Sequence, residues 1–225
     1  MKRQFVSYPK SGRSWLRYAL NQLGVDKFIQ FHHDSFEFND GNRPLPNFDF
    51  STRLNIYRRI DRVVYLYREP RDIMVSLYFQ IKGRFQDFFN YEGSISDFIR
   101  DDYFGAKNLK LFQDQWNQIC HMGFAHQISY EQCHDNFSNV LRDVLNYYEF
   151  SLPDNQIKNA SEAACYEAMK SVESSGSFNQ PWLRLRNGYP KVREGKMNNY
   201  KHYFTKNDLD YLLSVFDQEA NNTIG

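Results

Sequence analysis

The chain has 225 residues, of which 41% are hydrophobic and 17% aromatic, enough to bury one sizeable core and short for two full domains. Its 28 lysines and arginines nearly balance its 27 aspartates and glutamates, which excludes the overall basic field that non-specific nucleic-acid binding requires. We therefore expect one domain over residues 1–225, no nucleic-acid partner, and only local anion sites.

The chain carries no pattern that suggests export, membrane insertion or metal binding. Residues 1–6 run directly into a strand-like segment, and no apolar stretch is long enough for a signal peptide or a membrane span. The cysteines Cys120, Cys133 and Cys165 form no CxxC pair and no Cys/His metal spacing, and their odd number argues against a disulfide framework. We expect a cytoplasmic protein with reduced thiols, no membrane partner and no metal.

The first elements in chain order are a strand, a turn and a helix. Gln4 to Tyr8 is short and partly apolar, and residues 9–12, Pro-Lys-Ser-Gly, form a turn-forming cluster that should end a strand. Apolar residues then recur at helical spacing from Trp15 to Leu23. A loop between a strand and a helix exposes backbone N–H groups at the positive end of the helix dipole, so this segment predicts a phosphate or sulfate site.

The next segments predict a second strand-to-helix unit. Residues 27–31 favour a short strand, and residues 34–55, interrupted by glycine and proline, favour a loop. Arg62 to Tyr67 is the clearest buried strand, and Pro70 is well placed as the first residue of a helix that reaches Phe79.

The remaining segments continue the alternation of helices and strands. After an aromatic stretch, the pattern predicts helices from Ser96, over 109–119 and over 136–147, and a strand over 124–130. The polar run from Ser171 to Asn179 favours a mobile loop, and Thr205 with Asp208 resembles the cap of a final helix. Strands that alternate with helices argue for a parallel α/β sheet.

The loop after the first strand does not follow the Walker pattern. That pattern needs a glycine at its start and Gly-Lys-Ser/Thr at its end, whereas Lys10 precedes Ser11-Gly12 and no glycine lies in the five residues before it. An ordinary P-loop kinase is therefore disfavoured. Taken alone, Pro-Lys-Ser-Gly also fits a surface turn.

Three ordered motifs resemble those of the cytosolic sulfotransferases that use 3′-phosphoadenosine-5′-phosphosulfate (PAPS). Residues 8–15, Tyr-Pro-Lys-Ser-Gly-Arg-Ser-Trp, resemble the family's 5′-phosphosulfate loop. Residues 63–76 resemble its 3′-phosphate motif, in which an arginine at a strand end, here Arg68, precedes a serine by eight positions, here Ser76. Arg193-Glu194-Gly195 is similar to the family's Arg-Lys-Gly loop, and Tyr166 lies in a segment that resembles the one supplying an adenine-stacking aromatic ring.

This resemblance implies an α/β fold with a central parallel sheet of about five strands flanked by helices, and a phosphate loop related to that of P-loop kinases. It implies sulfuryl transfer from PAPS to a hydroxyl or amine, with adenosine 3′,5′-bisphosphate (PAP) as the product and no metal. The residues that it assigns to the donor are Pro9, Lys10, Ser11, Gly12, Arg13, Ser14, Trp15, Arg68, Ser76, Tyr166, Arg193 and Gly195.

Two positions depart from the family pattern. Arg13 replaces a threonine of the first loop, which adds charge near the phosphosulfate and removes a small hydroxyl. Glu194 replaces a lysine, and a carboxylate there would repel the 3′-phosphate unless it is turned outward or paired with Lys191 or Lys196.

Two histidines are the candidates for the general base that a hydroxyl acceptor needs, because the histidine pKa lies near neutral pH. His32 and His33 end the second predicted strand, and Asp34 follows them, where its carboxylate could orient a ring or raise its pKa. Since neighbouring strand side chains point to opposite faces, only one histidine can face the donor. We favour His33, with His32 as the alternative, and expect Lys10 to stabilise the charge of the leaving group.

Two other functions stay open on the sequence. A nucleotide or small-molecule kinase would share the strand–loop–helix unit and would require Mg²⁺ and ATP. A catalytically inactive protein would bind adenosine bisphosphate without turnover, and Glu194 keeps this alternative open. The acceptor, a small molecule or a carbohydrate, has no readable sequence code; the aromatic residues Phe85, Phe88, Phe89 and Tyr91 fit an acceptor wall or core packing equally well.

Overall fold

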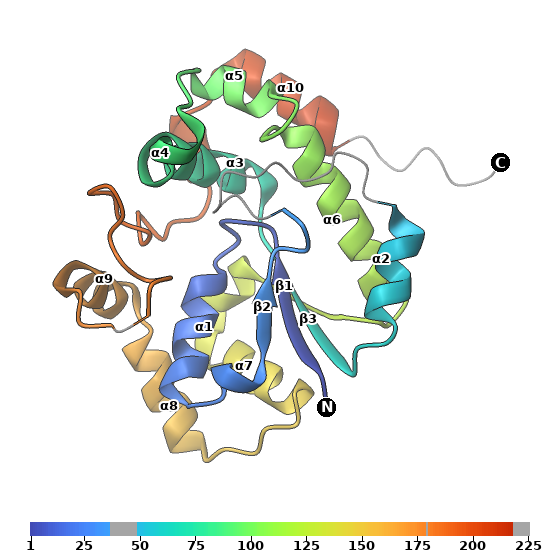
Figure 1. Cartoon of the computed structure of the whole chain (residues 1–225), viewed down its shortest axis with the longest axis vertical. Coiled ribbons are helices and arrows are strands. Elements are labelled where there is room, and N and C mark those ends of the chain that lie inside the picture. The colour runs from blue at the N-terminus through green and yellow to red at the C-terminus, as the bar shows by residue number, and fades with distance from the viewer. Residues whose placement is uncertain (37–48, 179, 218–225) are drawn as a thin grey trace.

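The computed structural model describes residues 1–36, 49–178 and 180–217 (Figure 1). Its centre is a parallel sheet of β1 (Arg3–Ser7), β2 (Gln30–His32), β3 (Arg62–Tyr67) and β4 (His126–Ser129), in the order β2-β1-β3-β4. Phe5 in the middle of β1 pairs with Phe31 on one side and with Val64 on the other. The predicted parallel α/β sheet is confirmed, but the described residues form four strands rather than the expected five.

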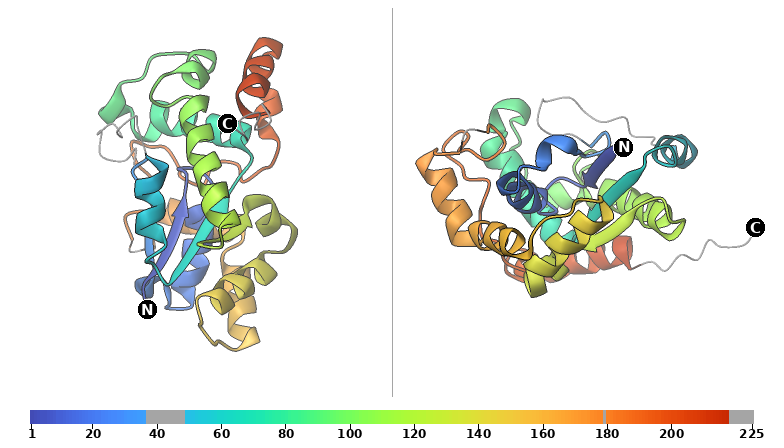
Figure 2. Two further views of the ribbon diagram at one scale, coloured as in Figure 1. Left: turned by 90° about the vertical axis from the view of Figure 1, so that its right-hand side faces the viewer. Right: turned by 90° about the horizontal axis from the view of Figure 1, so that it is seen from below.

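Helices cover both faces of the sheet (Figures 1 and 2). The helices on one side are α1 (Arg13–Gln22), α7 (Tyr130–Tyr147), α8 (Asp154–Ala163) and α9 (Tyr166–Ser175), which share one hydrophobic cluster with the sheet. The helices on the other side are α2 (Phe50–Tyr57), α3 (Pro70–Phe79), α4 (Gln86–Phe89), α5 (Ile95–Arg100), α6 (Ala106–His121) and α10 (Lys206–Phe216), most of which share the second cluster. Among these, α5 packs on α3 and α6, and α10 packs on α5 and α6. The shorter elements are two 3₁₀ turns, Asp26–Phe28 and Asn199–His202, and a π-helical turn, Gln80–Arg84.

The alternation of side chains along each strand divides the core in two. Val63 and Tyr65 of β3 enter the cluster beneath α3 and α6, whereas Val64 and Leu66 enter the cluster beneath α1 and α7. All four are at most 1% exposed. A strand buried on both faces must be continuously apolar, which is why this segment was the clearest strand in the sequence. Because β1 pairs in parallel with both β2 and β3, the carboxyl ends of these three strands lie at the same edge of the sheet.

Three predicted segments differ from the structure. The second strand lies at Gln30–His32 rather than 27–31, because a 3₁₀ turn takes its first residues. Of the expected loop 34–55, residues 37–48 lie outside the described residues, and α2 begins at Phe50 behind the cap Asp49, whose carboxylate accepts from Thr52 N. The first residues of the loop expected from Ser171 belong to α9, which reaches Ser175. In this part of the helix Glu173 is buried, and its carboxylate accepts hydrogen bonds from the backbone N–H groups of Lys191 and Val192. The last position of that expected loop, Asn179, also lies outside the described residues.

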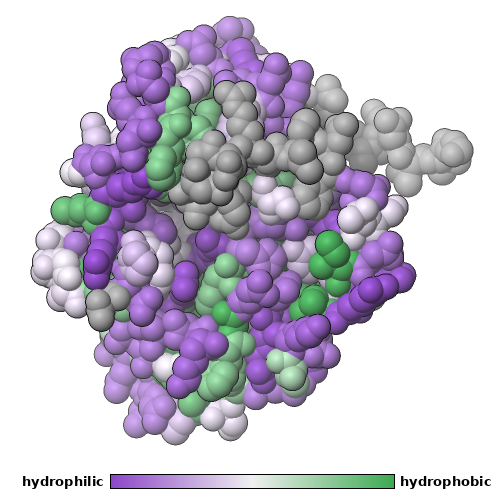
Figure 3. Space-filling view, in the orientation of Figure 1, coloured by the Kyte–Doolittle hydropathy of each residue, from purple (hydrophilic) through white to green (hydrophobic). Residues whose placement is uncertain are grey.

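The face of the molecule seen in Figure 3 is mostly polar where the structure describes it. In the orientation of Figure 1, hydrophilic side chains cover most of the visible face and apolar ones form only small groups (Figure 3). Within the described ranges, no helix combines the length and the apolar character that crossing a membrane would take.

Candidate active site

The loop between β1 and α1 has a backbone that exposes helix N–H groups. Lys10 and Gly12 have φ values of 73° and 104°, so both lie in the left-handed region. A Cβ at Gly12 would come within 2.5 Å of the ring of Tyr130. Gly12 is also the N-cap of α1 and provides no side chain to occupy the first N–H groups of the helix. These N–H groups are thus available to an anion.

Lys10 lies among other cations. Burial lowers the pKa of Lys10 to about 7, and the charges of Arg84, Arg68 and Arg193 act in the same direction. Such a lysine regains a full positive charge when an anion binds beside it. The gain of charge on Lys10 is the electrostatic reason to expect a phosphosulfate beside it.

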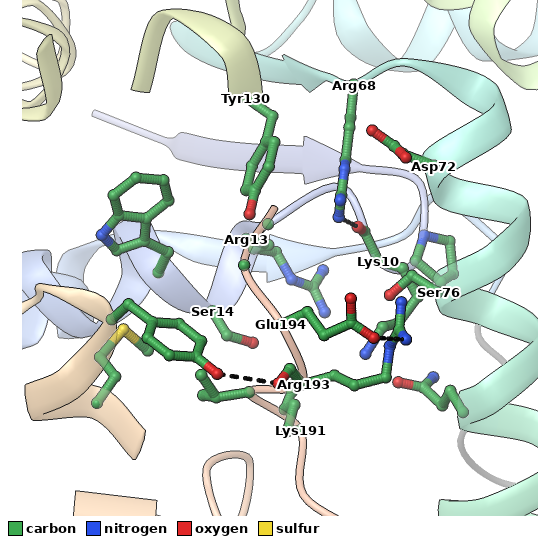
Figure 4. Close-up of a pocket in the computed structure, with 18 of the residues that line it drawn as sticks. Lys10, Arg13, Ser14, Arg68, Asp72, Ser76, Tyr130, Lys191, Arg193 and Glu194 are labelled. Atoms are coloured by element: carbon green, nitrogen blue, oxygen red, sulfur yellow. Dashed lines mark hydrogen bonds and ion pairs between the residues drawn. The ribbon is translucent and has the colours of Figure 1, made fainter. Parts of the chain in front are cut away.

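The three sequence motifs meet around one cavity of about 390 Å³ (Figure 4). Arg68 follows the end of β3, Ser76 lies on α3, and Arg193 and Gly195 lie on the segment after α9. The cavity is also lined by most other residues assigned to the donor: Pro9, Lys10, Gly12, Arg13, Ser14, Trp15 and Tyr166. Ser11 is 1% exposed and is not among the lining residues.

Arg68 spans two segments of the cavity wall. Its guanidinium donates to the carbonyl oxygens of Lys10 (2.9 Å) and Lys196 (3.3 Å), and it lies 4.1 Å from the centroid of the Tyr130 ring. Asp72, its neighbour one helical turn on, accepts instead from the backbone N–H groups of Asn198 and Tyr200. Arg68 and Asp72, although four residues apart, therefore use different partners.

Glu194 has a partner that the sequence did not indicate. Its carboxylate pairs with Arg193 and accepts from Tyr203 Oη (3.0 Å) and from Asn199. The expected partners Lys191 and Lys196 are not the ones it uses. Tyr166 Oη donates to the Arg193 carbonyl (3.0 Å), and Gly195 lies so close to the Tyr166 ring that a Cβ would be 2.8 Å away. Tyr166 and the 193–195 segment thus form one wall.

The two histidines point to different surroundings. His33 lines the cavity, with Nδ1 2.7 Å from the Ser7 carbonyl oxygen and Nε2 2.6 Å from Arg13 Nη2. Burial, and then the Arg13 charge, lower the pKa of His33 well below 6.5. His32 is absent from the lining and lies 3.2 Å from the side-chain oxygen of Gln4. His32 is the last residue of β2, whereas His33 begins the turn that follows the strand. The change of backbone conformation between them accounts for this separation.

Of the two rings that Asp34 could reach, it reaches His32 and not His33. Its backbone N–H donates to His32 Nδ1 (3.2 Å). Burial lowers the pKa of His32, and the Asp34 charge partly opposes this.

The Asp34 carboxylate pairs with Arg53 and accepts from Tyr57 Oη (2.7 Å) and Trp116 Nε1 (3.0 Å). Asp34 itself has a φ of 50°, so the chain turns sharply directly after His33. This buried network anchors the turn that carries the histidine, while the backbone carbonyl of Ser7 and the side chain of Arg13 hold the ring.

Several lining residues were not found from the sequence. Arg17 lies four residues after Arg13 on α1, a spacing that places both on one helix face and could have indicated it. Arg84 has no comparable signal. It donates to the carbonyl oxygens of Arg184 (2.8 Å) and Tyr189 (2.9 Å), 100 residues or more along the chain. Of the aromatic stretch, Phe85 lines the cavity. The remaining unpredicted lining residues include Phe31, Gln80, Tyr130, His134, Met169, Trp182 and Lys191.

Comparison with solved structures identifies the class of fold. A mouse sulfotransferase complexed with PAP superposes with a TM-score of 0.72 at 16% identity, covering 99% of this chain and 84% of that one. Retinol dehydratase in complex with androsterone and the inactive cofactor PAP gives a TM-score of 0.68 at 15% identity, with 99% and 81% covered. The fold is that of the sulfotransferases.

Sequence comparison identifies the family. A family model described as the sulfotransferase domain matches residues 54–223. Sulfotransferase 6B1 of the chimpanzee is 24% identical over 223 residues, covering 88% of this chain and 69% of the relative, and the human protein of that name is 22% identical over 224 residues, covering 89% and 70%. The chain belongs to the sulfotransferase family and is a sulfotransferase.

Proposed function

We propose that this protein, as one domain over residues 1–225, transfers the sulfuryl group of PAPS to a hydroxyl or amine, with His33 as the general base. The observation that carries the proposal is the convergence of Lys10, Arg68, Ser76 and Arg193 with His33 around one cavity. The solved neighbours named above contain PAP, the product that such a transfer leaves.

The 3′-phosphate would be held by Arg68, Ser76 and Arg193. The Nε atoms of both arginines are buried and have no hydrogen-bond partner within the described part of the chain. An unpaired buried donor is costly, and a phosphate oxygen is the acceptor that suits an arginine fork best. Trp15 and Tyr166 would lie against the adenine, as the family resemblance implies. Ser11 would contribute to the phosphate loop through its backbone, since its side chain is buried.

The transfer needs little beyond positioning and charge. The acceptor oxygen attacks the sulfur, the bond from sulfur to the 5′-phosphate oxygen breaks, and the acceptor proton passes to His33 Nε2. Lys10 and the N–H groups at the start of α1 would stabilise the charge left on the 5′-phosphate.

Arg13 must release His33 before the histidine can act. An arginine is always a donor, so its contact with Nε2 means that Nε2 carries the lone pair and Nδ1 carries the proton, which it donates to Ser7 O. This is the tautomer that a base needs, but Arg13 occupies its lone pair. The phosphosulfate is an anion that can draw Arg13 away, which would make the base available only when the donor is bound.

A binding comparison tests the donor assignment. Calorimetry should show PAP binding far more tightly than AMP, because AMP lacks the 3′-phosphate. Equal affinity for the two, or tighter binding of Mg-ATP than of either, would favour the kinase alternative.

A turnover assay separates an active enzyme from an inactive binding protein. Pools of alcohols, phenols, amines and carbohydrates are incubated with PAPS, and PAP release is measured for the wild type and for Lys10→Ala. We expect Lys10→Ala to lower turnover by about two to three orders of magnitude. Tight PAP binding without PAPS-dependent sulfation of any pool would instead support the alternative of a catalytically inactive binding protein, which the carboxylate of Glu194 had suggested.

A further inference from the structure

Four cations of the cavity lie outside the three donor motifs: Arg17, Arg84, Lys191 and Lys196. Two of them, Arg17 and Lys191, contact the same residue, Trp182. The guanidinium of Arg17 lies between the rings of Phe31 (4.8 Å to the centroid) and Trp182 (4.6 Å). Lys191 donates to the backbone carbonyl of the same Trp182 (2.8 Å). Phe31 precedes His33 by two positions, and both line the cavity. Arg17 and Lys191 therefore line the same cavity as the proposed general base, and Arg17 contacts the ring two positions before it.

The charges of the cavity exceed what the donor needs. Eight lysine and arginine side chains line it within the described residues, against the two carboxylates Asp72 and Glu194. Asp72 is engaged with backbone N–H groups, whereas Glu194 pairs with Arg193, one of the eight cations. Arg84 pairs with the buried Glu173 (3.5 Å). Setting these two ion pairs aside leaves six of the eight cations. PAPS brings about four negative charges, since a phosphate monoester carries about two and the phosphosulfate two.

Lys191 does not take the place of the family lysine missing at Glu194. Its Nζ donates to the Trp182 carbonyl oxygen (2.8 Å), whereas the Glu194 carboxylate pairs with Arg193. Burial, and then the charges of Lys10 and Arg13, lower the pKa of Lys191 well below 10.5. The Nε of Arg17 is buried and has no hydrogen-bond partner among the residues that the structure describes. A guanidinium N–H and a lysine amine that both contact Trp182 suit an anion, which would also favour the charged form of the lysine.

We propose that the acceptor is itself an anion: a hydroxyl or amine compound whose carboxylate, phosphate or sulfate group is held by Arg17 and Lys191 while its nucleophilic atom reaches His33. This inference rests on the proposed function of the same site. The rings of Phe31 and Trp182 would cover the apolar part of such a molecule, since they already pack against Arg17.

Matched pairs of probes test this inference. We compare 4-hydroxyphenylacetate with its uncharged amide, and glucose 6-phosphate with glucose, by calorimetry on the PAP-saturated enzyme and by PAPS-dependent turnover. In at least one pair, the anion should bind about tenfold more tightly than its neutral partner, with the higher kcat/KM. The difference should vanish in Lys191→Met and in Arg17→Met and persist in Lys191→Arg. It should also persist in Lys158→Met, which removes an exposed lysine that pairs with Glu162 on α8.

Two results overturn the inference. One is a neutral probe that binds and reacts as well as its anion in both pairs. The other is a Lys191→Met variant that loses turnover equally with both members of a pair, because this would mean that Lys191 serves the donor. The proposed function itself fails by a separate measurement, the absence of PAP binding.

Discussion

Donor binding should take up a proton, and Lys10 should be the group that takes it. In the free protein, burial and three arginines hold the pKa of Lys10 at about 7. A phosphosulfate beside the ammonium favours its charged form and so raises the pKa again. Lys10 is therefore partly neutral when free and protonated when PAP or PAPS is bound, which means that affinity falls as the pH rises through the free-state pKa.

The size of the effect follows from that pKa. At pH 7 about half a proton should be taken up per PAP bound, because about half of the Lys10 side chains are neutral. Between about pH 6 and about pH 8 the neutral fraction rises from about one tenth to about nine tenths. The Lys10 contribution to affinity should thus fall about tenfold, or about 1.4 kcal/mol.

Calorimetry in buffers of different ionisation enthalpy measures this uptake directly. The phosphate groups of PAP titrate near pH 6, so the same titrations on Lys10→Met supply the baseline to subtract. An uptake of about half a proton in the wild type, absent from Lys10→Met, is the expected result. If Lys10→Met takes up as many protons as the wild type, another group carries the linkage and the electrostatic argument for Lys10 is refuted.

Two further predictions concern the base and the turn behind it. His33→Ala should lower kcat by about 10² to 10⁴ with PAP affinity nearly unchanged, while His32→Ala stays active. The reverse pattern would make His32 the general base. If both variants stay active, neither histidine is the base. Arg53→Met leaves the buried Asp34 carboxylate without its ion-pair partner, so urea denaturation should show about 3–5 kcal/mol less stability. A loss below about 1 kcal/mol would contradict the anchoring role of this pair.

Local chemistry in the sequence was enough to predict the strands and helices that carry the site. The run from Arg62 to Tyr67 and the helix from Pro70 form as expected, because a strand buried on both faces must be apolar and proline suits the first turn of a helix. The reciprocal cap of Thr205 and Asp208 also forms as expected. These features depend on neighbours within a few residues, which the sequence displays directly.

The partners of the charged side chains depended on tertiary structure. Asp34 lies beside His32, but the ion-pair partner of its carboxylate is Arg53, which the sequence did not indicate. Glu194, expected beside a lysine, pairs with the adjacent Arg193. The sequence shows that a side chain is charged, but it does not show which oppositely charged side chain lies next to it in the fold. The same limit hid the second group of cations in the cavity.

What the sequence by itself determined is the order and type of the two strand-to-helix units β1–α1 and β3–α3, together with the residues of the three motifs. What only the tertiary structure decided is the meeting of α1, the π-helical turn and the segment after α9, which brings Arg17, Arg84 and Lys191 to one cavity. The physical reason is range: backbone conformation follows from contacts a few residues apart, whereas the potential inside a cavity sums charges from segments that are more than 100 residues apart in the chain.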